Sequence, residues 1–246
     1  MNSSSDLIQM YKDYYLDQNV LIKRRIAARQ SVDHLRLLLP RHNYRSLIDI
    51  GAGDGSVLVE LDKLNITNQL HAVEISESGC ASIRQKNIRS VKSINQFNGY
   101  HIPVADRSFE LGLAMHVLEH VEHERAFLCE ISRVCDFLYI EVPLELTFRL
   151  SNNIKSSRSF GHINFYNEAI FRNLLSTVNL EILNFKRFTA SIEYESHISN
   201  WPKSHMKYSI KTAALKYLPS CSHFFFTYMA GAFCRVHEIG SHKVSP

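Results

Sequence analysis

Three glycines within five residues form the segment of this sequence with the clearest chemical meaning. Gly51, Gly53 and Gly55 follow the apolar run LIDI and precede a segment of helical pattern, so they predict a sharp strand-to-helix turn. Glycine lets the backbone bend tightly and lets a ligand approach the main chain without meeting a side chain. We therefore expect a nucleoside-containing cofactor to bind at this turn; the alternative is a tight turn with no ligand.

The spacing of the glycines, together with one acidic residue, narrows the class of ligand. A dinucleotide-binding turn of the form GxGxxG needs a third glycine where this chain has Ser56, and the Gly-Lys-Ser/Thr of a P-loop does not follow. Glu74 ends the next apolar run, HAVEI, about 20 residues later, where an acid accepts hydrogen bonds from ribose hydroxyls. The glycine spacing and Glu74 together favour a ligand that contains a nucleoside but is not a dinucleotide. The alternative for Glu74 is an ordinary solvated glutamate at a strand end.

Histidines supply the second group of candidate chemical residues. His116, His120 and His123 would share one face of a helix, where they could bind a metal ion. His116 is expected to end a strand, however, so the helical spacing does not apply and we predict no metal site. His116 and His120 would instead face the crevice at the carboxyl ends of the strands. His162 is a candidate general base, because an imidazole titrates near neutral pH; the alternative is a histidine that only anchors its loop.

The elements that must position these residues follow from the hydrophobic pattern. Short apolar runs (SLIDI, HAVEI, FELGLAM, FLYIEV) alternate with helical segments, the last of them over residues 119–134 and 168–178. Such alternation is typical of a parallel sheet with helices on both faces. A strand at residues 180–188 and a last strand at 223–236 are expected to pair as a hairpin. Apolar spacing over residues 7–39 predicts two amphipathic helices ahead of the sheet.

Composition limits the possible classes of protein. The 246 residues are 45% hydrophobic and can form a full core. A net charge of +4 is too small to indicate nucleic-acid binding by itself. The five cysteines are odd in number and include no CxxC pair, which favours reduced thiols. With no signal-peptide pattern and no apolar run of about 20 residues, we expect a cytoplasmic protein.

Several motifs in order resemble the class I S-adenosylmethionine-dependent methyltransferases of the small-molecule, methyltransferase type 11-like kind. IDIGAGDGS resembles the first motif of that family, and Glu74 matches its ribose-binding acid. Residues 98–121, NGYHIPVADRSFELGLAMHVLEHV, are similar to its run from the adenine-binding loop through the fourth strand. The resemblance spans residues 46–188, and the C-terminal segment faintly resembles bacterial polysaccharide or glycolipid methyltransferases; a natural-product pathway is a further alternative.

The resemblance implies a fold and a domain organisation. The fold would be α/β, with a doubly wound, Rossmann-like seven-stranded sheet that is mostly parallel and has an antiparallel last strand. Residues 1–45 would form an N-terminal helical cap. Residues 46–246 would form the methyltransferase domain, with a variable helical insertion at about 196–221.

The resemblance also assigns residues to roles. S-adenosylmethionine would be held by Asp49, Gly51, Ala52, Gly53, Gly55, Glu74, Ile75, Asn98, Gly99, Met115 and His116. Asn98 stands where the family commonly has an aspartate, and Gln96 is the nearby alternative for contacting the adenine. His162 and then His116 would be the catalytic bases, while His120 and Tyr166 would line the substrate pocket.

These assignments predict methyl transfer to a small molecule, at the oxygen of a hydroxyl or a carboxylate. Nucleic acid is not the expected acceptor, because the Asn/Asp-Pro-Pro-aromatic signature is replaced by the sequence AMHV at residues 114–117. Two alternatives stay open: a non-catalytic binding protein that retains the fold, and an NAD-dependent oxidoreductase.

The segment 203–218, KSHMKYSIKTAALKYL, combines lysines with apolar residues at helical spacing. A basic amphipathic helix can contact an anionic membrane or an acidic substrate. The favoured interpretation is a surface helix over the sheet edge with solvated lysines, acting as a lid or specificity element.

Overall fold

The computed structural model describes residues 18–198 and 201–237. A seven-stranded sheet runs through the centre of the molecule in the order β3-β2-β1-β4-β5-β7-β6. Its strands are β1 (Leu47–Ile50), β2 (Leu70–Glu74), β3 (Val91–Gln96), β4 (Phe109–Met115), β5 (Cys135–Leu144), β6 (Leu180–Phe188) and β7 (Tyr228–Val236). Pairing is parallel from β3 to β5, while β7 is antiparallel to both β5 and β6. The predicted fold class is confirmed.

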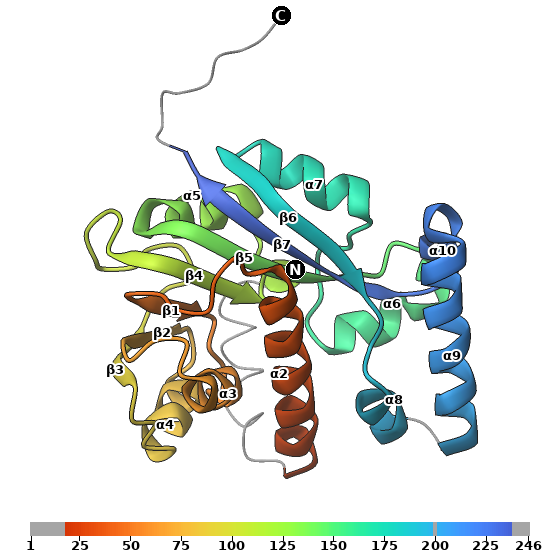
Figure 1. Cartoon of the computed structure of the whole chain (residues 1–246), viewed down its shortest axis with the longest axis horizontal. Coiled ribbons are helices and arrows are strands. Elements are labelled where there is room, and N and C mark those ends of the chain that lie inside the picture. The colour runs from red at the N-terminus through yellow and green to blue at the C-terminus, as the bar shows by residue number, and fades with distance from the viewer. Residues whose placement is uncertain (1–17, 199–200, 238–246) are drawn as a thin grey trace, which may run out of the picture.

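Helices cover both faces of the sheet (Figure 1). On one side lie α2 (Gln18–Leu38), α3 (Ser56–Leu64) and α4 (Glu77–Gln85); on the other lie α5 (Glu124–Val134) and α7 (Glu168–Ser176). Every residue of β1 and β4 is buried, as expected for parallel strands covered on both faces. Two apolar clusters, one on each side, form the core.

The order of the strands reverses at the centre of the sheet, between β1 and β4. Connections from these two neighbouring strands leave in opposite directions, which opens a crevice at their carboxyl ends. The glycine turn follows β1 and His116 follows β4, so both groups of candidate residues lie at this crevice.

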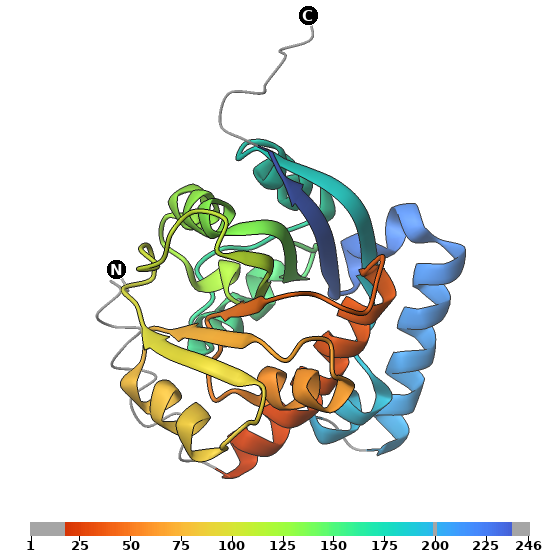
Figure 2. The ribbon, with the colours of Figure 1, turned by 60° about the vertical axis from the view of Figure 1, so that its left-hand side comes forward.

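Three further helices lie between β6 and β7, where the sequence predicted an insertion at about 196–221. They are α8 (Ile192–Ile198), α9 (Trp201–Tyr217) and α10 (Pro219–Phe225). Figure 2 shows α9 beside the β6 and β7 end of the sheet, and α8 packs against both α2 and α9. A further helix, α6 (Leu150–Ser159), follows β5.

The element boundaries correct the sequence prediction in two places. The helix predicted over residues 119–134 is divided into a 3₁₀ turn, η2 (Leu118–His120), and α5, which begins only at Glu124. The last strand begins at Tyr228 and not at residue 223, because Pro219 starts the short helix α10. Of the two helices predicted over residues 7–39, α2 accounts for the second, and most of the first lies outside the described residues.

Candidate functional site

The glycine turn after β1 adopts a backbone that other residues would strain. Gly51 and Gly53 have φ angles of +76° and +57°, in the left-handed region that favours glycine. A Cβ added to Gly51 would lie 2.7 Å from Cγ2 of Val117, the residue that follows His116. Gly51 therefore allows the loops after β1 and β4 to pack closely against each other at the crevice.

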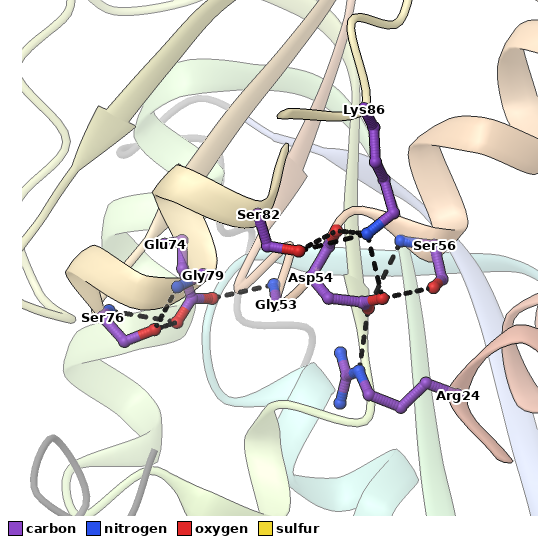
Figure 3. Close-up of polar contacts among 9 residues, drawn as sticks. All are labelled: Arg24, Gly53, Asp54, Ser56, Glu74, Ser76, Gly79, Ser82 and Lys86. Atoms are coloured by element: carbon purple, nitrogen blue, oxygen red, sulfur yellow. Dashed lines mark hydrogen bonds and ion pairs between the residues drawn. The ribbon is translucent and has the colours of Figure 1, made fainter. Parts of the chain in front are cut away.

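Glu74 lies at the end of β2 and is tied to the same turn (Figure 3). Its Oε2 accepts a hydrogen bond of 2.8 Å from the Gly53 N–H, and its Oε1 accepts bonds from the N–H and hydroxyl of Ser76. The side chain is only 4% exposed, yet it lines a cavity. A carboxylate oxygen accepts more than one hydrogen bond, so this arrangement presents a fixed acceptor to a ligand that carries hydroxyl groups.

A second carboxylate, Asp54, stabilises the turn. It was not among the predicted site residues. Oδ1 lies 2.8 Å from Nε of Arg24 on α2, and Oδ2 lies 3.2 Å from Nζ of Lys86 and 2.6 Å from the Ser56 hydroxyl (Figure 3). Burial alone would raise the pKa of Asp54, but Arg24 and these hydrogen bonds lower it to about 2. The carboxylate is therefore ionised at neutral pH and holds α2 against the turn.

Asp49 lies beneath the turn and does not line the cavity. It is fully buried in β1, and burial together with the nearby negative charge of Glu74 raises its pKa to about 7. Ala52 and Gly55 also lie outside the cavity lining. Gly55 caps the start of α3 and lies close to Ile83 of α4. These three residues shape the turn, whereas Gly51, Gly53, Glu74 and Ile75 face the cavity.

The loop after β3 differs from the expectation for Asn98. The side-chain Oδ1 accepts hydrogen bonds from the N–H groups of Tyr100 and His101, at 2.9 and 2.8 Å. This oxygen therefore stabilises its own loop, as in an Asx turn. Gln96, the alternative, donates from Nε2 to the Ile75 carbonyl. Asn98 and Gly99 nevertheless line the cavity, as does Met115.

His116 occupies a strained position at the end of β4, with a φ angle of +56°. Its Nε2 lies 3.1 Å from Oε1 of Glu141, and its Nδ1 lies 3.4 Å from Oε1 of Glu119. Burial alone would lower the pKa of His116, but hydrogen bonds with these two carboxylates raise it to about 10. At neutral pH His116 is a fixed cation and holds its own protons.

Glu141 is the fully buried anchor of this arrangement. It accepts hydrogen bonds from Ser31 and His34 on α2 and from the neighbouring Tyr139 hydroxyl, in addition to the contact with His116. The helix ahead of the sheet is therefore fixed at two points of the site, Asp54 and Glu141. No sequence motif predicted the contacts of α2 with Asp54 and Glu141, because the partners are far apart in the chain.

His162 lies in the segment between α6 and α7 and lines the same cavity as the glycine turn. Its Nδ1 is 2.7 Å from Oε2 of Glu145, which also accepts a hydrogen bond from the Ser157 hydroxyl. Burial alone would lower the pKa of His162, but the bond with Glu145 raises it above the ordinary 6.5. The ring of His120 packs edge-on against that of His162, with centroids 4.9 Å apart. His116, His120 and His162 all line the cavity.

Tyr166 and His123 do not line the cavity with His116, His120 and His162. Tyr166 is 2% exposed, and its hydroxyl donates to the Leu118 carbonyl and contacts Glu124, so the prediction that it contacts substrate is wrong. Its hydroxyl stabilises η2 through the bond to Leu118. His123 is exposed ahead of α5 and packs near Tyr100. The helical spacing of His116, His120 and His123 thus has no counterpart in the structure.

One cavity of about 770 Å³ joins these features. Its lining extends from Gly53 and Glu74 past His116 to His162, and on to Tyr194, Glu195 and Lys211 of the α8 and α9 insertion. Lys211 is buried, and its Nζ lies 3.1 Å from Oε1 of Glu195. Oε2 of Glu195 also pairs with Nζ of Lys207, at 2.7 Å. The prediction of solvated lysines on this helix is therefore wrong for Lys211, because a buried carboxylate from α8 balances its charge.

Among the helices in the described parts of the chain, none is both long and apolar enough to cross a bilayer.

Comparisons with known proteins bear on the same part of the chain. Residues 48–136 match the family model described as a methyltransferase domain. No curated protein sequence matches the chain significantly. Solved structures with the same fold include the [4+2]-cyclase SpnF, with a TM-score of 0.61, 16% identity, and coverage of 85% of this chain and 81% of that chain.

Two further structures are similar to the same degree. Geranyl diphosphate C-methyltransferase from Streptomyces coelicolor A3(2), in complex with Mg²⁺, geranyl diphosphate and S-adenosyl-L-homocysteine, has a TM-score of 0.62 and 12% identity over 85% of this chain and 79% of that chain. The MccD protein has a TM-score of 0.59 and 12% identity over 85% of this chain and 96% of that chain. At these identities the likeness concerns the fold.

Proposed function

The chain carries a methyltransferase domain in the fold of the S-adenosylmethionine-dependent methyltransferases, and from this premise we propose that it methylates an oxygen atom of a small molecule. The acceptor is a hydroxyl or a carboxylate. The observation that carries the proposal is the cavity that runs from the glycine turn and Glu74 to the His162–Glu145 pair. Cofactor and acceptor can therefore lie side by side in one cavity.

The residues present fit S-adenosylmethionine. Glu74 offers a buried, fixed carboxylate to the ribose hydroxyls, and Gly51 and Gly53 line the cavity near it without side chains. Ile75 and Met115 supply apolar surface along the same wall. The cavity volume of about 770 Å³ lies within the roughly 300–1,000 Å³ that small-molecule and cofactor sites usually have.

The bound cofactor supplies an electrophilic methyl group, so the protein's task is to hold the acceptor in line and to manage one proton. His162 is suited to accept that proton from a hydroxyl, because Glu145 orients its ring and leaves Nε2 for the cavity. A carboxylate acceptor is already ionised and needs no base. His116 is charged and engaged with Glu119 and Glu141, so it serves as a fixed positive group and not as the base.

The proposal has a direct test in two measurements. Calorimetry should detect binding of S-adenosylhomocysteine, and labelled S-adenosylmethionine should methylate members of a panel of small hydroxyl and carboxylate compounds. His162→Gln should retain cofactor affinity while transfer to a hydroxyl falls about 10²- to 10⁴-fold. His123→Gln is the matched control, because His123 is exposed outside the cluster. Absence of cofactor binding in the wild-type chain would refute the proposal.

A non-catalytic or differently acting protein on the same fold is the second candidate. The Asn98 oxygen is committed to its own loop, which leaves one expected adenine contact unmade. The cyclase named among the similar structures illustrates that the fold alone does not fix the reaction. Cofactor binding without methyl transfer to any acceptor of the panel would favour this candidate. The five cysteines are free, which is consistent with the cytoplasmic location that we propose.

A further inference from the structure

Three side chains gather at one wall of the cavity in an arrangement that the proposed function does not require. Glu119 and His120 come from η2, and His162 comes from the loop before α7. Each offers one ligand atom, and these atoms all lie within 4.8 Å of one another. All three residues line the cavity between the glycine turn and the helical insertion.

Backbone hydrogen bonds hold the two contributing segments together. The Glu119 carbonyl accepts bonds from the N–H groups of Ile163 and Asn164, at 2.9 and 3.0 Å. The Asn164 side chain in turn donates to the carbonyls of Leu118 and Val121. The residues on both sides of Glu119 and the residues after His162 are thereby joined, so the cluster does not depend on the chance orientation of mobile loops.

The hydrogen bonds of Glu119 and His162 leave one carboxylate oxygen and one imidazole nitrogen that could bind a metal ion. Glu119 is 1% exposed, and its Oε2 has no hydrogen-bond partner, although its Oε1 contacts His116. A buried carboxylate oxygen without a partner carries a free-energy cost that a bound cation would remove. The Nδ1 atom of His162 is bonded to Glu145, which leaves Nε2 for an ion; a carboxylate behind a metal-binding histidine is a common supporting contact.

We propose that Glu119, His120 and His162 form a binding site for a divalent transition-metal ion that opens into the cavity. One carboxylate and two imidazoles favour Zn²⁺, Mn²⁺, Fe²⁺ or Co²⁺ over Mg²⁺ and Ca²⁺, which prefer oxygen ligands. Three protein ligands leave a further coordination position for water or for a ligand oxygen, as in catalytic metal sites. The ligand atoms need only small side-chain movements to approach the roughly 2 Å of metal–ligand bonds.

The use of the ion in methyl transfer rests on the proposed function, whereas its binding does not. An acceptor hydroxyl at the open position would have a lower pKa, so its proton would pass to solvent water without a protein base. His162 would then be a ligand and not the base. The prediction of no metal site from the sequence considered His116, His120 and His123, which share no site; the present cluster combines a glutamate with a histidine from a different loop.

The test is titration of the chelator-treated full-length protein with Zn²⁺ and with Co²⁺. We expect one ion per chain, and for Co²⁺ a visible absorption band typical of a low-symmetry nitrogen and oxygen site. Glu119→Gln, His120→Ala and His162→Ala should each weaken binding at least about tenfold. His123→Ala, from the same loop, should bind as the wild type does. Far-UV circular dichroism and thermal unfolding identify any variant that fails to fold, and Glu119→Gln preserves the shape of the side chain.

Two results would overturn the inference. Wild-type protein that binds no transition-metal ion has no such site, and the Glu119 cluster is then a hydrogen-bond and charge network alone. Binding that persists unchanged in all three folded variants belongs to another part of the chain. Affinity for S-adenosylhomocysteine, measured on the same samples, separates this inference from the proposed function: cofactor binding without metal binding refutes only the metal site, and the reverse refutes only the proposed function.

Discussion

The two halves of the cavity are built in different ways. The half at β1 and β2 is formed by Gly51 and Gly53 of the glycine turn and by the carboxylate of Glu74, which accepts a hydrogen bond from the Gly53 N–H. The half at β4 and β5 consists of histidines and glutamates whose partners come from distant segments, such as His34 for Glu141. The first half depends on backbone shape and the second on a network of charges. Substitutions should therefore affect binding in one half, and proton or metal chemistry in the other.

The largest effect on cofactor affinity should come from changing the backbone of the glycine turn. Gly51→Val places a branched side chain at a φ of +76°, against Val117, and should weaken S-adenosylhomocysteine binding at least about 100-fold. Calorimetry measures the affinity, and Asn68→Ala on the surface is the control. If affinity stays within a few fold, cofactor binding does not depend on the shape of the turn, and the contrast between the halves is wrong.

A smaller loss of affinity is expected from Glu74→Gln. The substitution removes the charge that would strengthen hydrogen bonds from the ribose hydroxyls, so the dissociation constant of S-adenosylhomocysteine should rise about 10- to 100-fold. Glu77→Gln, at an exposed position on the adjacent helix, is the matched control. An unchanged affinity in Glu74→Gln would place the ribose elsewhere in the cavity.

In the histidine half the expected change is in pH dependence. Glu145 raises the pKa of His162, so the neutral imidazole becomes available only as the pH rises above the ordinary value of 6.5. Transfer to a hydroxyl should therefore increase with pH through this range, and Glu145→Gln should move the midpoint to lower pH. The rate of transfer against pH is the measurement. A midpoint that moves with the identity of the added metal ion, and not with Glu145→Gln, would assign the proton chemistry to the metal site.

The smallest effect should be on stability, through the ion pair between α2 and the glycine turn. Arg24 is partly exposed, so Arg24→Met should lower the free energy of unfolding by only about 1 kcal/mol at pH 7. The folded-state pKa of Asp54 is lowered to about 2, so its contribution is present above pH 3.8 and is lost as the pH falls toward 2. The difference between variant and wild type in urea unfolding should shrink correspondingly. A difference independent of pH would indicate lost packing.

The sequence predicted the parts of the molecule that depend on local pattern. The strand β6 has the predicted bounds, and the glycine turn follows β1 as expected, because apolar runs and glycines act through nearby residues. His162 and His116 were singled out by their residue type, and both line the cavity. Strand alternation also sufficed for the fold class.

Other features depended on contacts that no local pattern records. The partners of Asp54, on α2 and α4, and the pairing of Lys211 with Glu195 exist only after distant helices pack together. The Asn98 oxygen was expected to accept a hydrogen bond from adenine, but it accepts hydrogen bonds from the N–H groups of Tyr100 and His101 in its own loop. Tyr166 was misassigned because its phenol ring supports η2 from the core side.

The double attachment of α2 has a thermodynamic consequence. Arg24 binds the carboxylate that braces the glycine turn, and Ser31 and His34 bind the carboxylate that holds His116. Anything that stabilises the docked helix therefore favours both halves of the cavity at once. A ligand that orders one half of the cavity therefore lowers the free-energy cost of ordering the other half. The affinities of two ligands that bind in the two halves are thus coupled through α2, and each ligand raises the affinity for the other by the same factor.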